Sequence, residues 1–146
     1  MIATTNFKIL VILGPNMNLL GLRQKDKKGR NTMDKLNRHL RKTARAKGLS
    51  LTIFQTNNEA CAVSRLQSQR KKIKGILLFP GPWQQSGHVI KDTLKILDIP
   101  CITVSLGEKI GVLKEIKNME GSNIYKSSEK ALSKLENLIN LRLNNY

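Results

Sequence analysis

The chain alternates between two kinds of hydrophobic pattern, and this alternation is what most limits its possible folds. Short, dense apolar runs are typical of buried strands, whereas apolar residues three or four positions apart are typical of helices. The predicted strands are residues 7–13, 51–55, 75–79 and 101–106. The predicted helices are residues 32–47, 59–73, 87–97 and 127–143. Buried strands separated by helices predict an α/β fold, with a parallel sheet covered by helices on both faces.

The length and composition favour one folded domain spanning residues 1–146. The chain has 146 residues, of which 40% are hydrophobic and 25% are charged, and these values are close to globular averages. In open parallel sheets, ligands bind where the carboxyl ends of the strands meet. The loops expected there are residues 14–31, 55–60, 79–88 and 105–118.

The sequence favours a cytoplasmic protein. It has no apolar run approaching the ~20 residues that a membrane span needs, and its first residues do not resemble a secretory signal. The two cysteines, Cys61 and Cys101, are 40 residues apart. They are expected to be small core residues in a reduced protein. With only two histidines, the chain offers a poor ligand set for zinc.

The net charge of +16 is the unusual feature of the composition. Residues 1–50 contain 12 basic and 2 acidic side chains, and residues 51–146 contain 14 and 8. Such a charge attracts nucleic acid, phosphates or anionic metabolites. Codon bias is the alternative explanation, because Lys, Asn and Ile are all abundant. Aromatic residues make up only 4% of the chain, which disfavours a module that binds nucleic acid by stacking on its bases.

The first predicted strand leads into the segment 14–23, which reads GPNMNLLGLR. Its glycines permit tight turns, and its two asparagines can donate or accept hydrogen bonds. The segment lacks both the dinucleotide-binding G-x-G-x-x-G pattern and the Gly-Lys-Ser/Thr of a P-loop. The cationic residues that follow are either a solvated charge run or a clamp for a carboxylate or phosphate. No Ser-His-Asp or Cys-His pairing is indicated by spacing.

This segment closely resembles the first loop of type II 3-dehydroquinases, G-P-N-x-N-L-L-G-x-R. Three further segments resemble the family in order and spacing. They are residues 56–59 (TNNE), residues 79–94 (FPG through IKDTL) and residues 100–106 (PCITVSL). The resemblance covers nearly the whole chain and implies a flavodoxin-like three-layer sandwich.

The resemblance also implies a reaction and an assembly. The family dehydrates 3-dehydroquinate to 3-dehydroshikimate in the shikimate pathway, without metal or cofactor. A tyrosine on the first loop removes a proton next to the ketone, an asparagine holds a water that stabilises the enolate, and a histidine assists loss of water. Family members form trimers, and four trimers make a dodecamer, so a homo-oligomer that binds a small anionic substrate is expected.

Four positions retain the family's residue. Asn16 matches the asparagine that holds the water, and Arg23 matches the arginine of the first loop. Glu59 matches the glutamate of the second loop. Asp92 matches an aspartate that reaches a neighbouring subunit's site.

The other site positions depart from the family. Lys28 stands at the catalytic tyrosine position, and Ser105 stands at the catalytic histidine position, where Thr103 replaces the supporting glutamate. Phe79 replaces a substrate-binding asparagine, and Gln85 replaces a substrate-binding histidine. The segment that binds substrate in the family reads Ser105-Leu106-Gly107 here, so Leu106 and Gly107 are candidate substrate contacts.

These departures leave several functions open. Loss of a general acid or base typically lowers the rate by about 10²- to 10⁴-fold, and serine has no pKa suited to proton transfer near neutrality. Lys28 is a rescue base if neighbouring cations lower its pKa, and His88 is the one nearby substitute acid. The sequence therefore favours a dehydroquinase-like protein with lost or impaired activity. A working enzyme and a basic scaffold that binds nucleic acid or another anionic partner are the alternatives.

Overall fold

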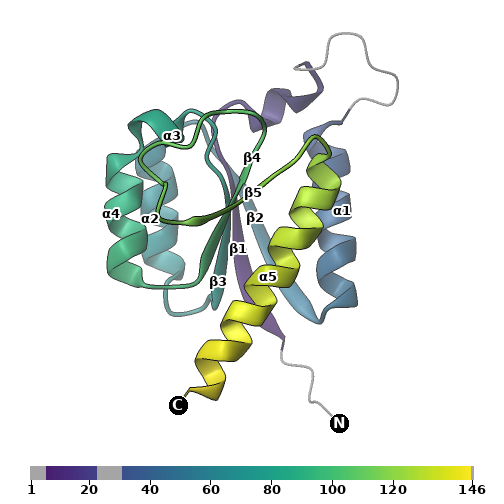
Figure 1. The fold of residues 1–146 in the computed structure, drawn as a ribbon, viewed down its shortest axis with the longest axis vertical. Helices are drawn as coiled ribbons and strands as arrows, with labels where there is room; N and C mark the ends of the chain where they lie inside the picture. Colours follow the sequence, from purple (N-terminus) through teal and green to yellow (C-terminus); the bar gives the residue numbers. More distant parts are fainter. Residues whose placement is uncertain (1–5, 23–30, 146) are drawn as a thin grey trace.

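The computed structural model describes residues 6–22 and 31–145, which form a five-stranded, all-parallel sheet in the order β2-β1-β3-β4-β5 (Figure 1). The strands are β1 (Phe7–Leu13), β2 (Leu49–Gln55), β3 (Gly75–Phe79), β4 (Cys101–Ser105) and β5 (Lys117–Glu120). The helices are η1 (Met17–Leu22), α1 (Met33–Ala46), α2 (Glu59–Gln69), α3 (Trp83–Ser86), α4 (His88–Leu97) and α5 (Ile124–Asn144). The predicted α/β class and its flavodoxin-like three-layer arrangement are confirmed.

Helices cover both faces of the sheet, with α1 and α5 on one face and α2 and α4 on the other (Figure 1). Side chains of β1 alternate between the two resulting cores. Ile9, Val11 and Leu13 pack on the α1 and α5 side, while Leu10 and Ile12 pack on the α2 and α4 side. All of them are completely buried, which is why a central parallel strand forms a continuous apolar run.

The first predicted helix is confirmed as α1, with Thr32 as its N-terminal cap and Gly48 just beyond its C-terminal end. The hydroxyl of Thr32 accepts a hydrogen bond from the backbone N–H of Lys35 at 3.2 Å, and Gly48 adopts a positive φ of 71° after the last turn. Such a conformation favours glycine. Elsewhere the boundaries shift: α2 ends at Gln69, before the predicted residue 73, and α5 begins at Ile124.

The sequence did not predict strand β5, which begins at the end of the predicted loop 105–118. Its residues Lys117–Glu120 include a single apolar side chain, Met119, so they lack the dense apolar pattern used to find the other strands. β5 is an edge strand that pairs only with β4. One side of an edge strand faces no other strand, and its sequence is therefore less apolar than that of a central strand.

The prediction that both cysteines are core residues is wrong for Cys61, which is exposed on α2. Cys101 begins β4 and packs against the α2 and α4 core. Burial raises the pKa of its thiol from 9.0 to about 12. Trp83 is 4% exposed in the same core, so it seals the interior at the start of α3.

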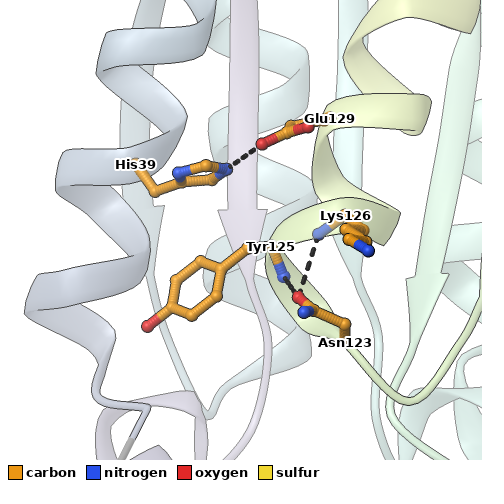
Figure 2. A network of polar contacts seen from close by, with 5 residues as sticks. All are labelled: His39, Asn123, Tyr125, Lys126 and Glu129. Carbon is orange, nitrogen blue, oxygen red and sulfur yellow. Dashed lines mark hydrogen bonds and ion pairs between the residues drawn. The ribbon is translucent and has the colours of Figure 1, made fainter. Parts of the chain in front are cut away.

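A polar contact joins α1 to α5. Nε2 of His39 lies 2.7 Å from Oε2 of Glu129, and the His39 ring meets the Tyr125 ring edge-on at 5.0 Å (Figure 2). His39, predicted to be a surface histidine, is therefore partly enclosed between the two helices. Within the described part of the chain, no helix is both long and apolar enough to cross a membrane.

Candidate functional site

The five strands are parallel, so their carboxyl ends meet at one edge of the sheet. The turn after β1 is held against the end of β3, where the N–H of Gly14 donates to the carbonyl oxygen of Phe79 at 2.9 Å. A Cβ atom at Gly14 would lie 2.5 Å from that same oxygen. Only glycine permits this close approach of the two backbones.

The loops after β1 and β2 are joined through side-chain amides. The N–H of Asn16 donates to Oδ1 of Asn57 at 3.0 Å. Nε2 of Gln55 donates to the same oxygen and to the carbonyl of Gly14, both at 3.2 Å. Asn16 has a positive φ of 69°, which asparagine tolerates better than most residues. The network fixes its backbone, and its side chain is exposed at the edge of the sheet.

Glu59 connects two helices of the same layer. It is the first residue of α2, and its Oε2 accepts a hydrogen bond of 2.9 Å from the N–H of Ile90, in the first turn of α4. A carboxylate is favourable at a helix N-terminus, where unpaired N–H groups and the helix dipole attract negative charge. The contact is therefore a cap of α4.

The end of β4 carries a buried polar chain instead of an acid–base pair. Oγ1 of Thr103 donates to Oδ1 of Asn118 at 2.7 Å, and Nδ2 of Asn118 donates to Oγ of Ser105 at 3.0 Å. Thr103 is completely buried, and Ser105 is 1% exposed. Asn118 lies opposite Thr103 in the register of β4 and β5. Hydroxyls and an amide form this chain, so it contains no group that titrates near neutral pH.

The segment after β4 folds back onto α3. Gln84, which is completely buried, accepts hydrogen bonds from the N–H groups of Gly111 and Val112, at 2.9 Å and 2.7 Å. Nε2 of Gln85 donates to the carbonyl of Lys109 at 3.2 Å. Gln85 thus holds the loop in place within the isolated chain.

A cavity of about 850 Å³ opens at this edge. Of the predicted contacts, Leu106 and Gly107 line it, and two carboxylates, Glu108 and Glu120, line it as well. Oε2 of Glu108 also accepts a hydrogen bond from the N–H of Leu106 at 3.0 Å. The other described lining residues are Leu20, Asn31, Gly121, Ser122 and Ile124. The described lining therefore carries two negative charges and no cationic side chain.

The predicted site residues fall into three groups. Seven lie at the carboxyl edge: Asn16, Glu59, Phe79, Gln85, Ser105, Leu106 and Gly107. Phe79 is only 1% exposed, because its side chain packs in the α1 and α5 core. Asp92 lies apart from them, exposed on α4. Arg23 and Lys28 lie outside the described residues.

Sequence reasoning missed Asn118 and Glu120. Both belong to β5, and the missed strand left no reason to place them beside β4. Among the described residues, no group of three or more His, Cys, Asp or Glu side chains is arranged to hold a metal ion.

The parallel α/β sandwich is a flavodoxin-like fold. Its candidate ligand-binding site lies at the carboxyl edge of the sheet. The sequence pattern of the family "Dehydroquinase class II" matches residues 7–112. The chain belongs to this family.

Individual relatives agree. The chain is 38% identical over 100 residues to a 3-dehydroquinate dehydratase of Trichodesmium erythraeum, covering 68% of this chain and 67% of that protein. It is 38% identical over 94 residues to a catabolic 3-dehydroquinase of Penicillium rubens, covering 64% and 61%. The chain thus spans about two thirds of the length of these relatives. A type II dehydroquinase structure from Butyrivibrio crossotus superposes with a TM-score of 0.80 at 25% identity, covering 90% of this chain and 98% of that one.

Proposed function

We propose that this chain is a class II dehydroquinase-fold protein in which dehydration of 3-dehydroquinate is lost or strongly impaired. The observation that carries the proposal is the end of β4. There, the position that resembles the family's catalytic histidine is Ser105, and its hydroxyl is bound by Asn118. A histidine can supply a proton near neutral pH, whereas a serine hydroxyl cannot.

The cavity beside this position also disfavours the family substrate. 3-Dehydroquinate carries a carboxylate, and binding it requires cationic groups or N–H donors. Glu108 and Glu120 instead contribute negative charge to the cavity lining. Like charges at close range repel each other, so the described part of this cavity is better suited to a neutral or cationic ligand.

The proposal extends to the first loop. By resemblance, Lys28 stands where the family places its tyrosine base, and Arg23 stands at the neighbouring arginine. A lysine acts as a base only when its pKa is strongly lowered. Asn16 keeps the position of the asparagine that holds the water. In this proposal, the family's asparagine is kept at Asn16, and the groups that transfer protons are missing.

We also propose that the chain forms a homo-oligomer, either a trimer or a dodecamer made of four trimers. Two apolar side chains on α4 support this proposal: Val89 is 59% exposed, and Ile96 is 72% exposed. Asp92 lies between them at helical spacing, three and four residues away, so the three side chains share one side of the helix. Contact with a second subunit would cover this apolar surface and place Asp92 at the interface.

Turnover of 3-dehydroquinate at high enzyme concentration tests the proposal, with the ultraviolet absorbance of the conjugated product as the readout. A working relative, the Trichodesmium erythraeum enzyme, is the positive control. Loss of both acid and base predicts a rate lower than that of the relative by ~10⁴-fold or more. A rate within tenfold of the relative would contradict the proposal.

Two variants make the result interpretable. The double variant Lys28→Tyr, Ser105→His restores the family's groups, and regained turnover would show that the remaining pocket is competent. Since Ser105 is buried, thermal unfolding must first show that this variant folds. Ser105→Ala in the natural protein is the matched control: if the natural protein has no turnover, this change has no effect on the measured rate.

A further inference from the structure

Helix α1 presents a dense row of cationic side chains to solvent. They follow one another at spacings of three and four residues, which places them on one side of a helix. Its apolar residues Leu36, Leu40 and Ala44 are buried on the opposite side. Its one acidic residue, Asp34, lies in the first turn. The exposed cationic residues of this side, called here the α1 basic face, are Lys35, Arg38, Arg41, Lys42 and Arg45.

The neighbouring helix extends this basic surface. α5 lies beside α1 over the same face of the sheet (Figure 1), and its Lys126 and Lys130 are exposed. The contact between His39 and Glu129 joins the two helices (Figure 2). Glu129, the acidic residue at this joint, is therefore engaged with His39 and does not pair with the row of cations.

One end of the α1 basic face borders a small depression of about 220 Å³. Arg41, Arg45, Asn6 and Ser50 are among its lining residues. Nη1 of Arg41 donates to the carbonyl of Leu51 at 3.2 Å, which holds that guanidinium against β2. Two guanidinium groups beside a hydroxyl form a donor set that matches the oxygens of a phosphate group.

We propose that the α1 basic face binds the phosphate backbone of double-stranded nucleic acid without reading its sequence. Residues 35 to 45 span ~15 Å of helix, and duplex DNA presents one phosphate charge per ~1.7 Å of its axis. The row of cations therefore faces several phosphates at once. This activity goes beyond the proposed enzymatic scaffold and does not depend on it.

Other polyanions fit the surface less well. Amphipathic helices that bind a membrane surface insert an apolar face into the lipid in addition to presenting basic residues, and the apolar side of α1 is already buried against the sheet. Recognition of single strands uses aromatic side chains on which bases stack, and none of the five residues of the α1 basic face is aromatic. An acidic protein remains a competitor that the experiment must distinguish.

The test compares two triple variants that remove the same charge from opposite faces of the sheet. Arg38→Gln, Lys42→Gln, Arg45→Gln changes the α1 basic face. Lys95→Gln, Lys109→Gln, Lys114→Gln changes exposed lysines on or near the α4 side. Because both variants lose three positive charges, a difference between them reports where the ligand binds. Thermal unfolding checks that both remain folded.

Binding is measured by fluorescence anisotropy with a mixed-sequence duplex of about 20 base pairs, a scrambled duplex and polyglutamate, starting at about 50 mM salt. We expect equal affinity for the two duplexes and weaker binding of polyglutamate. The α1 triple variant should bind ~100-fold more weakly than the natural protein, with a slope of log K against log salt reduced by ~2.7. The control variant should stay within about threefold of the natural protein.

Three outcomes would overturn the proposal. The first is no binding of the duplex at about 50 mM salt. The second is equal weakening in both triple variants, which would mean that only total charge matters. The third is tighter binding of polyglutamate than of duplex, which would identify an acidic protein as the partner. None of these readouts depends on turnover of 3-dehydroquinate, so failure of either proposal is recognisable separately.

Discussion

The two halves of the carboxyl edge are built in different ways. Where β1, β2 and β3 end, a backbone group takes part in most of the contacts: the N–H of Gly14 donates to the carbonyl of Phe79, and the N–H of Asn16 donates to Oδ1 of Asn57. Where β4 and β5 end, side chains bond to one another, as Asn118 does to Ser105. By resemblance, the first half keeps the family's residues at Asn16 and Glu59 but not at Phe79, and the second half has Ser105 at the histidine position.

The difference shows which contacts of the fold depend on particular residues and which can be made by different side chains. Contacts between backbones depend on the absence of a side chain or on a special φ, so they require particular residues such as glycine. Side chains that bond to one another can be replaced together, because a different group of hydrogen-bonding side chains can also give every buried polar atom a partner. Proton transfer belongs to side chains, and by resemblance the positions that would perform it are Lys28 in the first half and Ser105 in the second.

The largest expected effect concerns the first half. Gly14→Ala places a Cβ about 2.5 Å from the carbonyl oxygen of Phe79, so β1 and β3 must move apart. We expect a loss of ~3 kcal/mol in the free energy of unfolding, because overpacking between backbones relaxes poorly. Urea denaturation measures it.

Gly107→Ala is the matched comparison in the second half. Gly107 has a φ of 108°, and no atom lies within 4 Å of an added Cβ. Its cost is therefore conformational only, about 1–2 kcal/mol. If Gly107→Ala costs as much as Gly14→Ala, the claim that the first half depends on close backbone approach is wrong.

The second prediction concerns the polar chain of the second half. Asn118→Ala removes the shared partner of Thr103 and Ser105 and leaves two buried hydroxyls without it. We expect a loss of ~2 kcal/mol in the free energy of unfolding, since unsatisfied buried groups are costly. Asn137→Ala, at an exposed position of α5, serves as the control and should change stability by less than ~0.5 kcal/mol. If the two variants lose the same free energy of unfolding, Asn118 does not hold the polar chain of Thr103 and Ser105 together.

The same contrast explains what the sequence could predict. The run FKILVIL at residues 7–13 predicts a central strand, because burial on both faces of a sheet explains its five consecutive aliphatic residues, 9–13. The Thr32 cap is equally local. The pairing of Ser105 with Asn118 depends on β5, an edge strand with one apolar residue, and no local pattern signals it. The family resemblance located the edge but not the side-chain partner of Ser105.

The smallest expected effect concerns Glu59, which couples α2 to α4 within the half that resembles the family. Glu59→Ala removes the acceptor for the N–H of Ile90, and we expect a loss of ~1 kcal/mol in the free energy of unfolding, as for other helix caps. Glu59→Gln keeps an acceptor oxygen but loses the charge, so it should lose less than Glu59→Ala. Glu115→Ala removes an exposed ion pair with Lys91 and should be nearly neutral. If Glu59→Ala changes the free energy of unfolding as little as Glu115→Ala does, the contact with Ile90 does not stabilise α4. The role of the Glu59 carboxylate would then be to bind a ligand.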